Sequence, residues 1–131
     1  MKRSATIIVL VGLLASILAA CAPAAGRPIV QYEANAPDLI STIAEIAVQL
    51  QPSSSYNYYS VNQISDRYIQ LKASTVGGIT FFFGGDTSVI TFTASQNGDV
   101  VNLAASSNGD LGNKTIDKIL LQLDTKYQRL R

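Results

Sequence analysis

The spacing of apolar residues changes twice along this chain, and this change constrains the fold more than any other feature. Apolar side chains recur at helical spacing over residues 36–51 and again over residues 114–129. Between Tyr56 and Ala105 the spacing falls to two, which is typical of strands that bury one face. A one-sided sheet needs a covering layer, and two amphipathic helices are available to form it. The pattern therefore predicts an α+β fold of order β-α-β-β-β-β-α.

The first helix is predicted over Ala36–Gln51, after a short strand over Ile29–Glu33. Asn35 is a typical N-cap residue, and Pro37 suits a first turn because its missing amide hydrogen has no partner there. Pro52 and the serines after it end the helix. The buried stripe is predicted to comprise Leu39, Ile43, Ile46, Ala47 and Leu50.

An antiparallel meander of four to five strands is predicted for the middle of the chain, because turn signals separate short alternating segments. Gly77-Gly78 and Gly84-Gly85-Asp86 are two of these signals, and Asn97-Gly98 is a typical two-residue hairpin turn with positive φ at both positions. The predicted strand segments are Tyr56–Tyr58, Arg67–Ala73, Ile79–Phe83, Ser88–Ser95 and Val101–Ala105. The inward side chains are predicted to be Ile69, Leu71, Ala73, Ile90, Phe92, Ala94, Val101, Leu103 and Ala105.

The segment Ile79–Phe83 differs from the other strands because it is apolar on both faces. It is either a central strand covered on both sides or an exposed strand that invites addition of a strand from a partner. A loop over Ser106–Gly112 and a second helix over Lys114–Arg129 complete the domain. The helix carries an apolar stripe of Ile116, Ile119, Leu120, Leu123 and Tyr127.

The N-terminus has the organisation of a bacterial export signal. Lys2 and Arg3 precede sixteen uncharged residues, from Ala5 to Ala20. This run is shorter than the ~20 residues that a helix needs to cross the hydrocarbon core, and its length suits a cleaved signal. An ordinary secretory signal and a short membrane anchor are the alternatives.

The run ends in Leu18-Ala19-Ala20-Cys21, which resembles the lipobox of bacterial lipoproteins. This resemblance implies that the thiol of Cys21 receives a diacylglyceryl group and that cleavage falls between Ala20 and Cys21. The new amino group is often acylated as well. The chain would then be exported and held on a membrane by its lipid. Because residue 22 is Ala rather than Asp, the outer membrane is favoured if the host has two membranes, and otherwise the outer face of the cytoplasmic membrane.

Three regions follow from these observations: a cleaved signal at 1–20, a lipidated cysteine and tether at 21–28, and one α+β domain at 29–131. The tether contains two prolines and small residues, and it shows no apolar periodicity. The order of elements in the domain is similar to that of small helix-grip-like modules in envelope lipoproteins. Fold similarity of this kind does not imply a function.

The residue inventory argues against catalysis and against binding of metals, cofactors or nucleic acids. The chain has no histidine and one cysteine, which excludes zinc sites built from these residues and any histidine-based triad. Without Lys2 and Arg3 the chain has eight basic and nine acidic residues, so it lacks the basic excess of a nucleic-acid binder. Three Gly-Asp pairs, which contain Asp86, Asp99 and Asp110, are typical turn residues spaced too widely for a calcium loop.

A tyrosine cluster is the best candidate for a binding surface. Tyr56, Tyr58, Tyr59 and Tyr68 are predicted to lie on adjacent strands, with Tyr68 pointing away from the core. Tyr56, Tyr58 and Tyr68 are the predicted binding residues. Tyrosine offers both contact area and a polar tip, although it also packs commonly within sheets. We therefore expect a non-enzymatic interaction or accessory module of an envelope complex. The alternative is a carrier of a small apolar ligand, held between the sheet and the C-terminal helix.

Overall fold

The fold is α+β, with an antiparallel sheet and two helices. The computed structural model describes residues 27–76 and 85–131. The predicted signal at 1–20, Cys21 and the predicted strand Ile79–Phe83 lie outside the described residues. The described elements are β1 (Val30–Glu33), α2 (Ala36–Ala47), β2 (Ser60–Ser65), β3 (Tyr68–Ser74), β4 (Thr87–Asn97), β5 (Val100–Ser107), α4 (Asp110–Lys126) and β6 (Gln128–Arg129).

The sheet has six described strands in the order β2-β3-β4-β5-β1-β6, where four or five were expected. Strands β2 to β5 form the predicted meander, with antiparallel pairs between neighbours. β1 then pairs with β5, and the short strand β6 pairs with β1. The sheet is therefore open, with β2 at one edge and β6 at the other.

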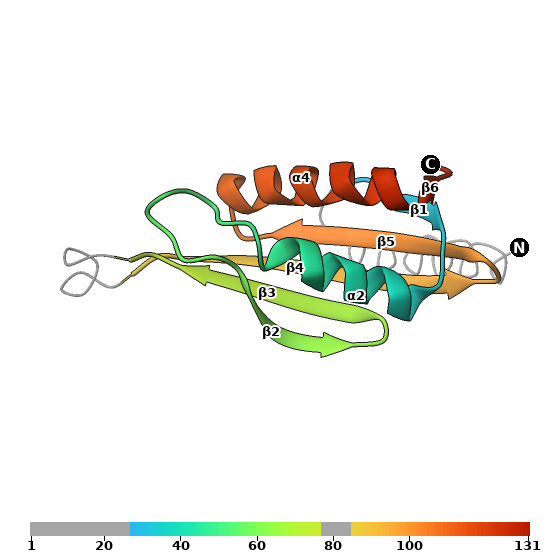
Figure 1. The fold of residues 1–131 in the computed structure, drawn as a ribbon, viewed down its shortest axis with the longest axis horizontal. Coiled ribbons are helices and arrows are strands. Elements are labelled where there is room, and N and C mark those ends of the chain that lie inside the picture. Colours follow the sequence, from blue (N-terminus) through green and yellow to red (C-terminus); the bar gives the residue numbers. More distant parts are fainter. Residues whose placement is uncertain (1–26, 77–84) are drawn as a thin grey trace, which may run out of the picture.

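Both helices pack on the same face of this sheet. α2 contacts β2, β3, β4 and α4, while α4 contacts β4 and β5. In Figure 1 the two helices run along the length of the strands in opposite directions. The predicted inward positions of β3 and β4 are buried, as are Val101 and Leu103, and Ala105 is half-buried. The alternation in the sequence was thus sufficient to identify the core face. Because both helices pack on that face, the opposite face of the sheet has no covering layer among the described residues.

The first helix ends at Ala47 rather than at the predicted Gln51. The amide of Gln49 donates to Ile46 O and that of Leu50 to Ala47 O, so the last turn tightens into i to i+3 bonds. Leu50 O then accepts a hydrogen bond from the amide of Tyr59, which leads the chain toward β2. The predicted N-cap position at Asn35 is confirmed, although its side chain makes no capping hydrogen bond.

The second helix runs from Asp110 to Lys126, so it begins and ends earlier than the predicted Lys114–Arg129. Its start was missed because Gly112 was interpreted as part of a loop. Gly112 is buried, and a Cβ there would lie 2.7 Å from Ser107 Cβ, so glycine is needed for the close approach of α4 to β5. At the other end the backbone of Tyr127 is extended, and β6 follows.

One predicted strand and one predicted turn were also wrong in position. The strand expected at Tyr56–Tyr58 is a loop with one bridge from Tyr56 to Thr75, and the edge strand is Ser60–Ser65. The hairpin between β4 and β5 is confirmed, but its central residues are Gly98 and Asp99. Gly98 has a φ of 60°, whereas no described residue other than glycine has positive φ.

Candidate interaction surface

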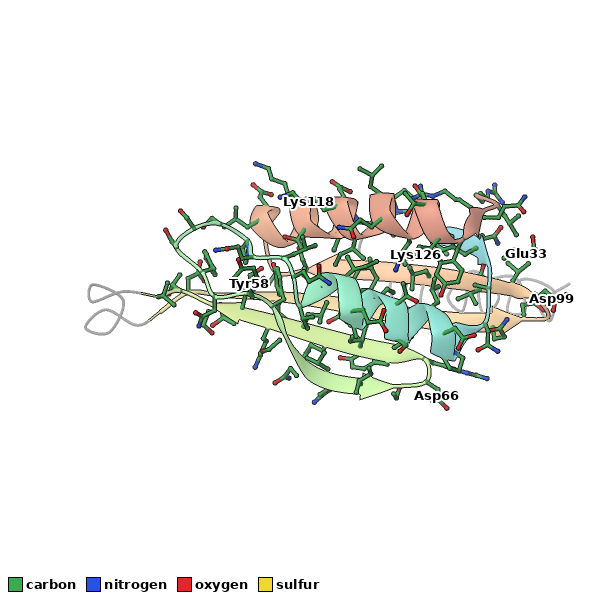
Figure 2. All side chains as sticks on the ribbon, in the orientation of Figure 1. Glu33, Tyr58, Asp66, Asp99, Lys118 and Lys126 are labelled. Carbon is green, nitrogen blue, oxygen red and sulfur yellow. The ribbon has the colours of Figure 1, made fainter. Side chains whose placement is uncertain are left out.

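The structure does not bring the three predicted tyrosines together. Tyr56 bridges to Thr75 just beyond the end of β3, while Tyr68 is the first residue of that strand. Seven residue steps of extended chain separate Tyr68 from Thr75, which corresponds to roughly 23 Å. Figure 2 labels Tyr58 near one end of the sheet and Asp66, in the turn beside Tyr68, near the other. The predicted tyrosine patch is therefore not a single surface.

The exposure of the three tyrosines also differs from the prediction. Tyr58 is 59% exposed and Tyr68 is half-buried, but Tyr56 is buried. The hydroxyl of Tyr56 donates to Asp86 Oδ2 at 2.9 Å, and this hydrogen bond together with desolvation raises the pKa of Tyr56. Tyr56 therefore holds the loop after α2 against the start of β4, and its ring is not available to a partner.

Among the described residues, the face of the sheet opposite the two helices is a mainly polar surface with little charge. Its side chains on β3, β4 and β5 carry hydroxyl, amide or small apolar groups, and Lys72 is the only charged residue among them. They are Tyr68, Gln70, Lys72, Ser74, Thr87, Val89, Thr91, Thr93, Ser95, Asn97, Val100, Asn102, Ala104 and Ser106. We call this surface the open face.

The register of the strands places the side chains of the open face in rows across the sheet. Gln70 pairs with Thr91, which pairs with Ser106, and Tyr68 pairs with Thr93, which pairs with Ala104. On the neighbouring strand β1, Gln31 Nε2 donates to Asn102 Oδ1 at 2.8 Å. The members of these rows on β4 and β5 are short side chains, so a second protein surface can approach the sheet closely over these two strands.

The edge strand β2 is a second exposed feature, and the sequence pattern did not predict it. All six of its residues are exposed, including Val61 at 38% and Ile64 at 55%. Its pairing with β3 shifts register between Val61 and Gln63, so Asn62 is an additional residue in a β-bulge. The bulge places two apolar residues three positions apart on one face, which breaks the period of two that identifies strands.

A polar network at the C-terminal end of α4 was likewise not predicted. The hydroxyl of the buried Tyr32 donates to Asp124 Oδ1 at 2.9 Å, and Arg129 Nε donates to the same oxygen at 2.8 Å. The guanidinium of Arg129 also lies over the ring of Tyr32, 5.7 Å from its centroid. The network ties β1, α4 and β6 together, and it has the character of a structural contact.

We expect this network to make stability fall at high pH. Burial, followed by the hydrogen bond to Asp124, raises the pKa of Tyr32 to about 12, although Arg129 opposes the shift. The folded state favours the neutral phenol of Tyr32. The resulting stabilisation of the folded state is complete below pH 10 and is lost as the pH rises through 12. The loss amounts to about 2–3 kcal/mol in the free energy of unfolding. Urea unfolding across this range should show a smaller decrease for Tyr32→Phe than for the natural chain.

Tyr58→Phe is the matched control for this experiment, because Tyr58 is exposed and lies outside the network. It should leave the pH dependence of unfolding unchanged. If the free energy of unfolding fell equally with pH for the natural chain and Tyr32→Phe, the phenol of Tyr32 would not contribute to the loss of stability at high pH.

The hollows on the described surface are shallow and open. One of them has a volume of about 600 Å³ and lies at the N-terminal end of α2, between Glu33, Asp66, Arg67 and Asp99. A hollow of about 150 Å³ is lined by Tyr56 together with Asp86 and Asp110, so two of the three Gly-Asp turns meet there. The part of the chain that the structure describes contains no group of three His, Cys, Asp or Glu residues that could hold a metal ion.

The helices of the described domain and the position of Arg27 bear on how the chain lies relative to a membrane. No helix in residues 27–76 or 85–131 is long and apolar enough to cross a membrane. Arg27, which follows the predicted tether, forms an ion pair with Asp117 on α4. The chain therefore enters the domain beside the helix layer.

Comparison of the chain with protein-family models, curated proteins and solved structures finds no match.

Proposed function

We propose that this protein is a lipid-anchored, non-enzymatic interaction module of the bacterial cell envelope, and that it binds a protein partner through its open face. The observation that carries the proposal is the near-absence of charge on that face. Lys72 alone is charged among its fourteen residues on β3, β4 and β5, and Glu33, which pairs with Val100, adds one charge at its margin on β1. Surfaces that are designed to stay soluble carry about 25–35% charged residues. Depletion of charge is a feature of the centre of protein interfaces.

The point at which the tether joins the domain supports this proposal. Arg27, at the beginning of the described domain, lies at the helix layer, where it forms an exposed ion pair with Asp117. Six residue steps separate Arg27 from Cys21, which gives a reach of at most about 20 Å. A lipid on Cys21 would keep the helix layer nearer the bilayer, and the open face on the other side of the sheet would remain accessible.

The packing of α4 does not favour the alternative of an apolar-ligand carrier. That function needs a space between the sheet and the C-terminal helix. Ile116, Ile119 and Leu123 are fully buried there against the sheet. Hollows of about 600 and 470 Å³ lie instead at the N-terminal end of α2 and beside Ile29 and Arg131 on the surface. We therefore retain the interaction module as the proposed function.

A charged side chain in the middle of the open face should abolish partner binding. Thr93 is exposed and lies between Tyr68 and Ala104 in the strand register, so Thr93→Arg places a long cation at the centre of the face. We expect the yield of a partner cross-linked to the full chain in intact cells to fall at least tenfold, because a desolvated, unpaired charge costs several kcal/mol. A photo-activatable residue at Thr91 would report the cross-link.

The matched control is Gln122→Arg, on the exposed side of α4. It adds the same charge to the helix layer, so it should leave the cross-link unchanged. Equal yields from Thr93→Arg and the natural chain would remove the open face from consideration. A loss in both variants would point to net charge rather than to this surface.

A further inference from the structure

We propose that two copies of this chain pair antiparallel through β2, with the two-fold axis between Asn62 and Gln63. The residues of β2 read Ser-Val-Asn-Gln-Ile-Ser, which is nearly the same chemical sequence in both directions. Pairing about this axis places Ser60 opposite Ser65, Val61 opposite Ile64 and Asn62 opposite Gln63 of the second copy. Like therefore meets like at every position, which is the condition that an isologous interface requires.

The orientation of the side chains agrees with this register at each pair. Val61 pairs with Leu71 and Ile64 with Ile69, so both apolar residues point to the helix side of the sheet. Gln63 pairs with Gln70, and Asn62 Nδ2 donates to Gln70 Oε1 at 2.6 Å, so both amides lie on the open face. Residues directly opposite one another in an antiparallel pair share a face. The bulge at Asn62 thus gives β2 a symmetry that a regular six-residue strand cannot have.

The two edges of the sheet differ in their protection against strand addition. β6 contains two residues, one of which is Arg129, and Arg131 follows it. Short, cationic edges of this kind oppose pairing with another strand. β2 has six residues, no charge and no proline, and it has a neighbour on one side only among the described strands. The chain therefore protects one edge and leaves the other competent to pair.

The exposed apolar area of β2 gives the contact a driving force. Val61 and Ile64 are 38% and 55% exposed. Pairing would place Val61 of one copy beside Ile64 of the second copy, on the helix side of the sheet. Apolar side chains that lie directly opposite one another on paired strands stabilise a sheet. Six residues form a small interface, so the self-association is expected to be weak in dilute solution.

The symmetry of the dimer is compatible with attachment of both copies to one membrane. A two-fold axis between antiparallel edge strands runs perpendicular to the sheet, so both helix layers lie on the same side of a continuous sheet. Arg27 joins the helix layer in each copy, so both tethers leave from that side. This step rests on the proposed lipid anchor, which would raise the local concentration of the copies. The pairing of β2 itself does not depend on the anchor.

Cysteine cross-linking between two variants of the full chain tests both the contact and its register. Ser60→Cys faces position 65 of the partner, and Ser65→Cys faces position 60. Purified in detergent and oxidised, each variant alone should give only the background that Cys21 gives in the natural chain. Their mixture should give at least tenfold more disulfide-linked dimer, because equivalent positions lie roughly 17 Å apart whereas positions 60 and 65 are direct neighbours.

Two further substitutions separate edge pairing from random collision. Asn62→Lys, introduced into both cysteine variants, places cations near the two-fold axis and should reduce the cross-linked dimer at least tenfold. Leu130→Lys adds the same charge at the opposite edge, where Leu130 is 45% exposed, and should leave the yield unchanged. Circular dichroism of each variant would establish that the chain is folded. A folded mixture that gives no cross-link above background, or equal cross-linking of Ser60→Cys alone, would overturn the proposal.

Discussion

Replacement of Cys21 by Ser is expected to abolish incorporation of labelled palmitate into this protein when the full chain is expressed in a bacterium. The resemblance of Leu18-Ala19-Ala20-Cys21 to a lipobox implies that the thiol carries the lipid, and a serine hydroxyl does not replace a thiolate nucleophile in this transfer. The effect should be all or none, because the chain has no other cysteine. Mass spectrometry of the natural chain should show residues 21–131 with added diacylglyceryl and acyl groups.

The proposed anchor also has a predicted consequence for partition between membrane and soluble fractions. Each buried methylene contributes ~0.8 kcal/mol, and a single chain gives only marginal binding, whereas two or three chains hold a protein on the bilayer. The natural chain should therefore sediment with membranes. A version that begins at Ala22 behind an ordinary secretory signal should be soluble.

Ala22→Ser is the matched control for Cys21→Ser, because it alters the neighbouring residue and keeps the cysteine. It should retain both the label and the membrane association. A natural chain without label, or label that persists in Cys21→Ser, would contradict the lipoprotein interpretation. Either result would leave the described domain as it is and remove only the proposed anchor.

The parts of the fold that were predicted correctly are those in which local periodicity and tertiary packing agree. Ile69, Leu71 and Ala73 alternate with polar residues, and all three are buried under the helix layer. Ile116 and Ile119 follow a helical stripe, and both are fully buried in α4. In these segments the sequence pattern and the burial have the same physical cause, because one face of each element must leave water.

The parts that were predicted wrongly depend on contacts between distant residues. β6 forms because Leu130 N donates to Gln31 O and Gln31 N donates to Arg131 O, and nothing near Gln128 in the sequence signals this pairing. β2 was missed because its bulge puts Val61 and Ile64 out of alternation. Gly112 is helical because a neighbouring strand requires a close approach, whereas local propensity suggests a turn.

The candidate surface was predictable only in its general chemistry. The absence of histidine and the distribution of carboxylates directed the interpretation away from catalysis. The tyrosines that were predicted to form one patch are separated from one another, because Tyr56 and Tyr58 lie in a loop and not in a strand beside Tyr68. The open face was not recognised, because a face with little charge emerges only when the registers of β3, β4 and β5 are known.

Phe92→Ala is expected to reduce the free energy of unfolding by about 3–5 kcal/mol, the largest effect on stability that we predict. Phe92 is fully buried in β4, where it pairs with Ile69 on one side and Ala105 on the other. Removal of its ring leaves a cavity under the helix layer, which the helices cannot fill without moving. Because domains of this size are stable by about 5–15 kcal/mol, the variant should unfold at a much lower urea concentration.

Thr93→Ala is the matched control, because Thr93 is the next residue of the same strand and points to the open face. A substitution there should change the free energy of unfolding by no more than about 0.5 kcal/mol. The contrast between two adjacent residues measures directly whether the sheet is covered on one side only. A loss of several kcal/mol from Thr93→Ala would mean that the open face is covered in the folded protein, and binding of a partner there would then require that cover to be displaced.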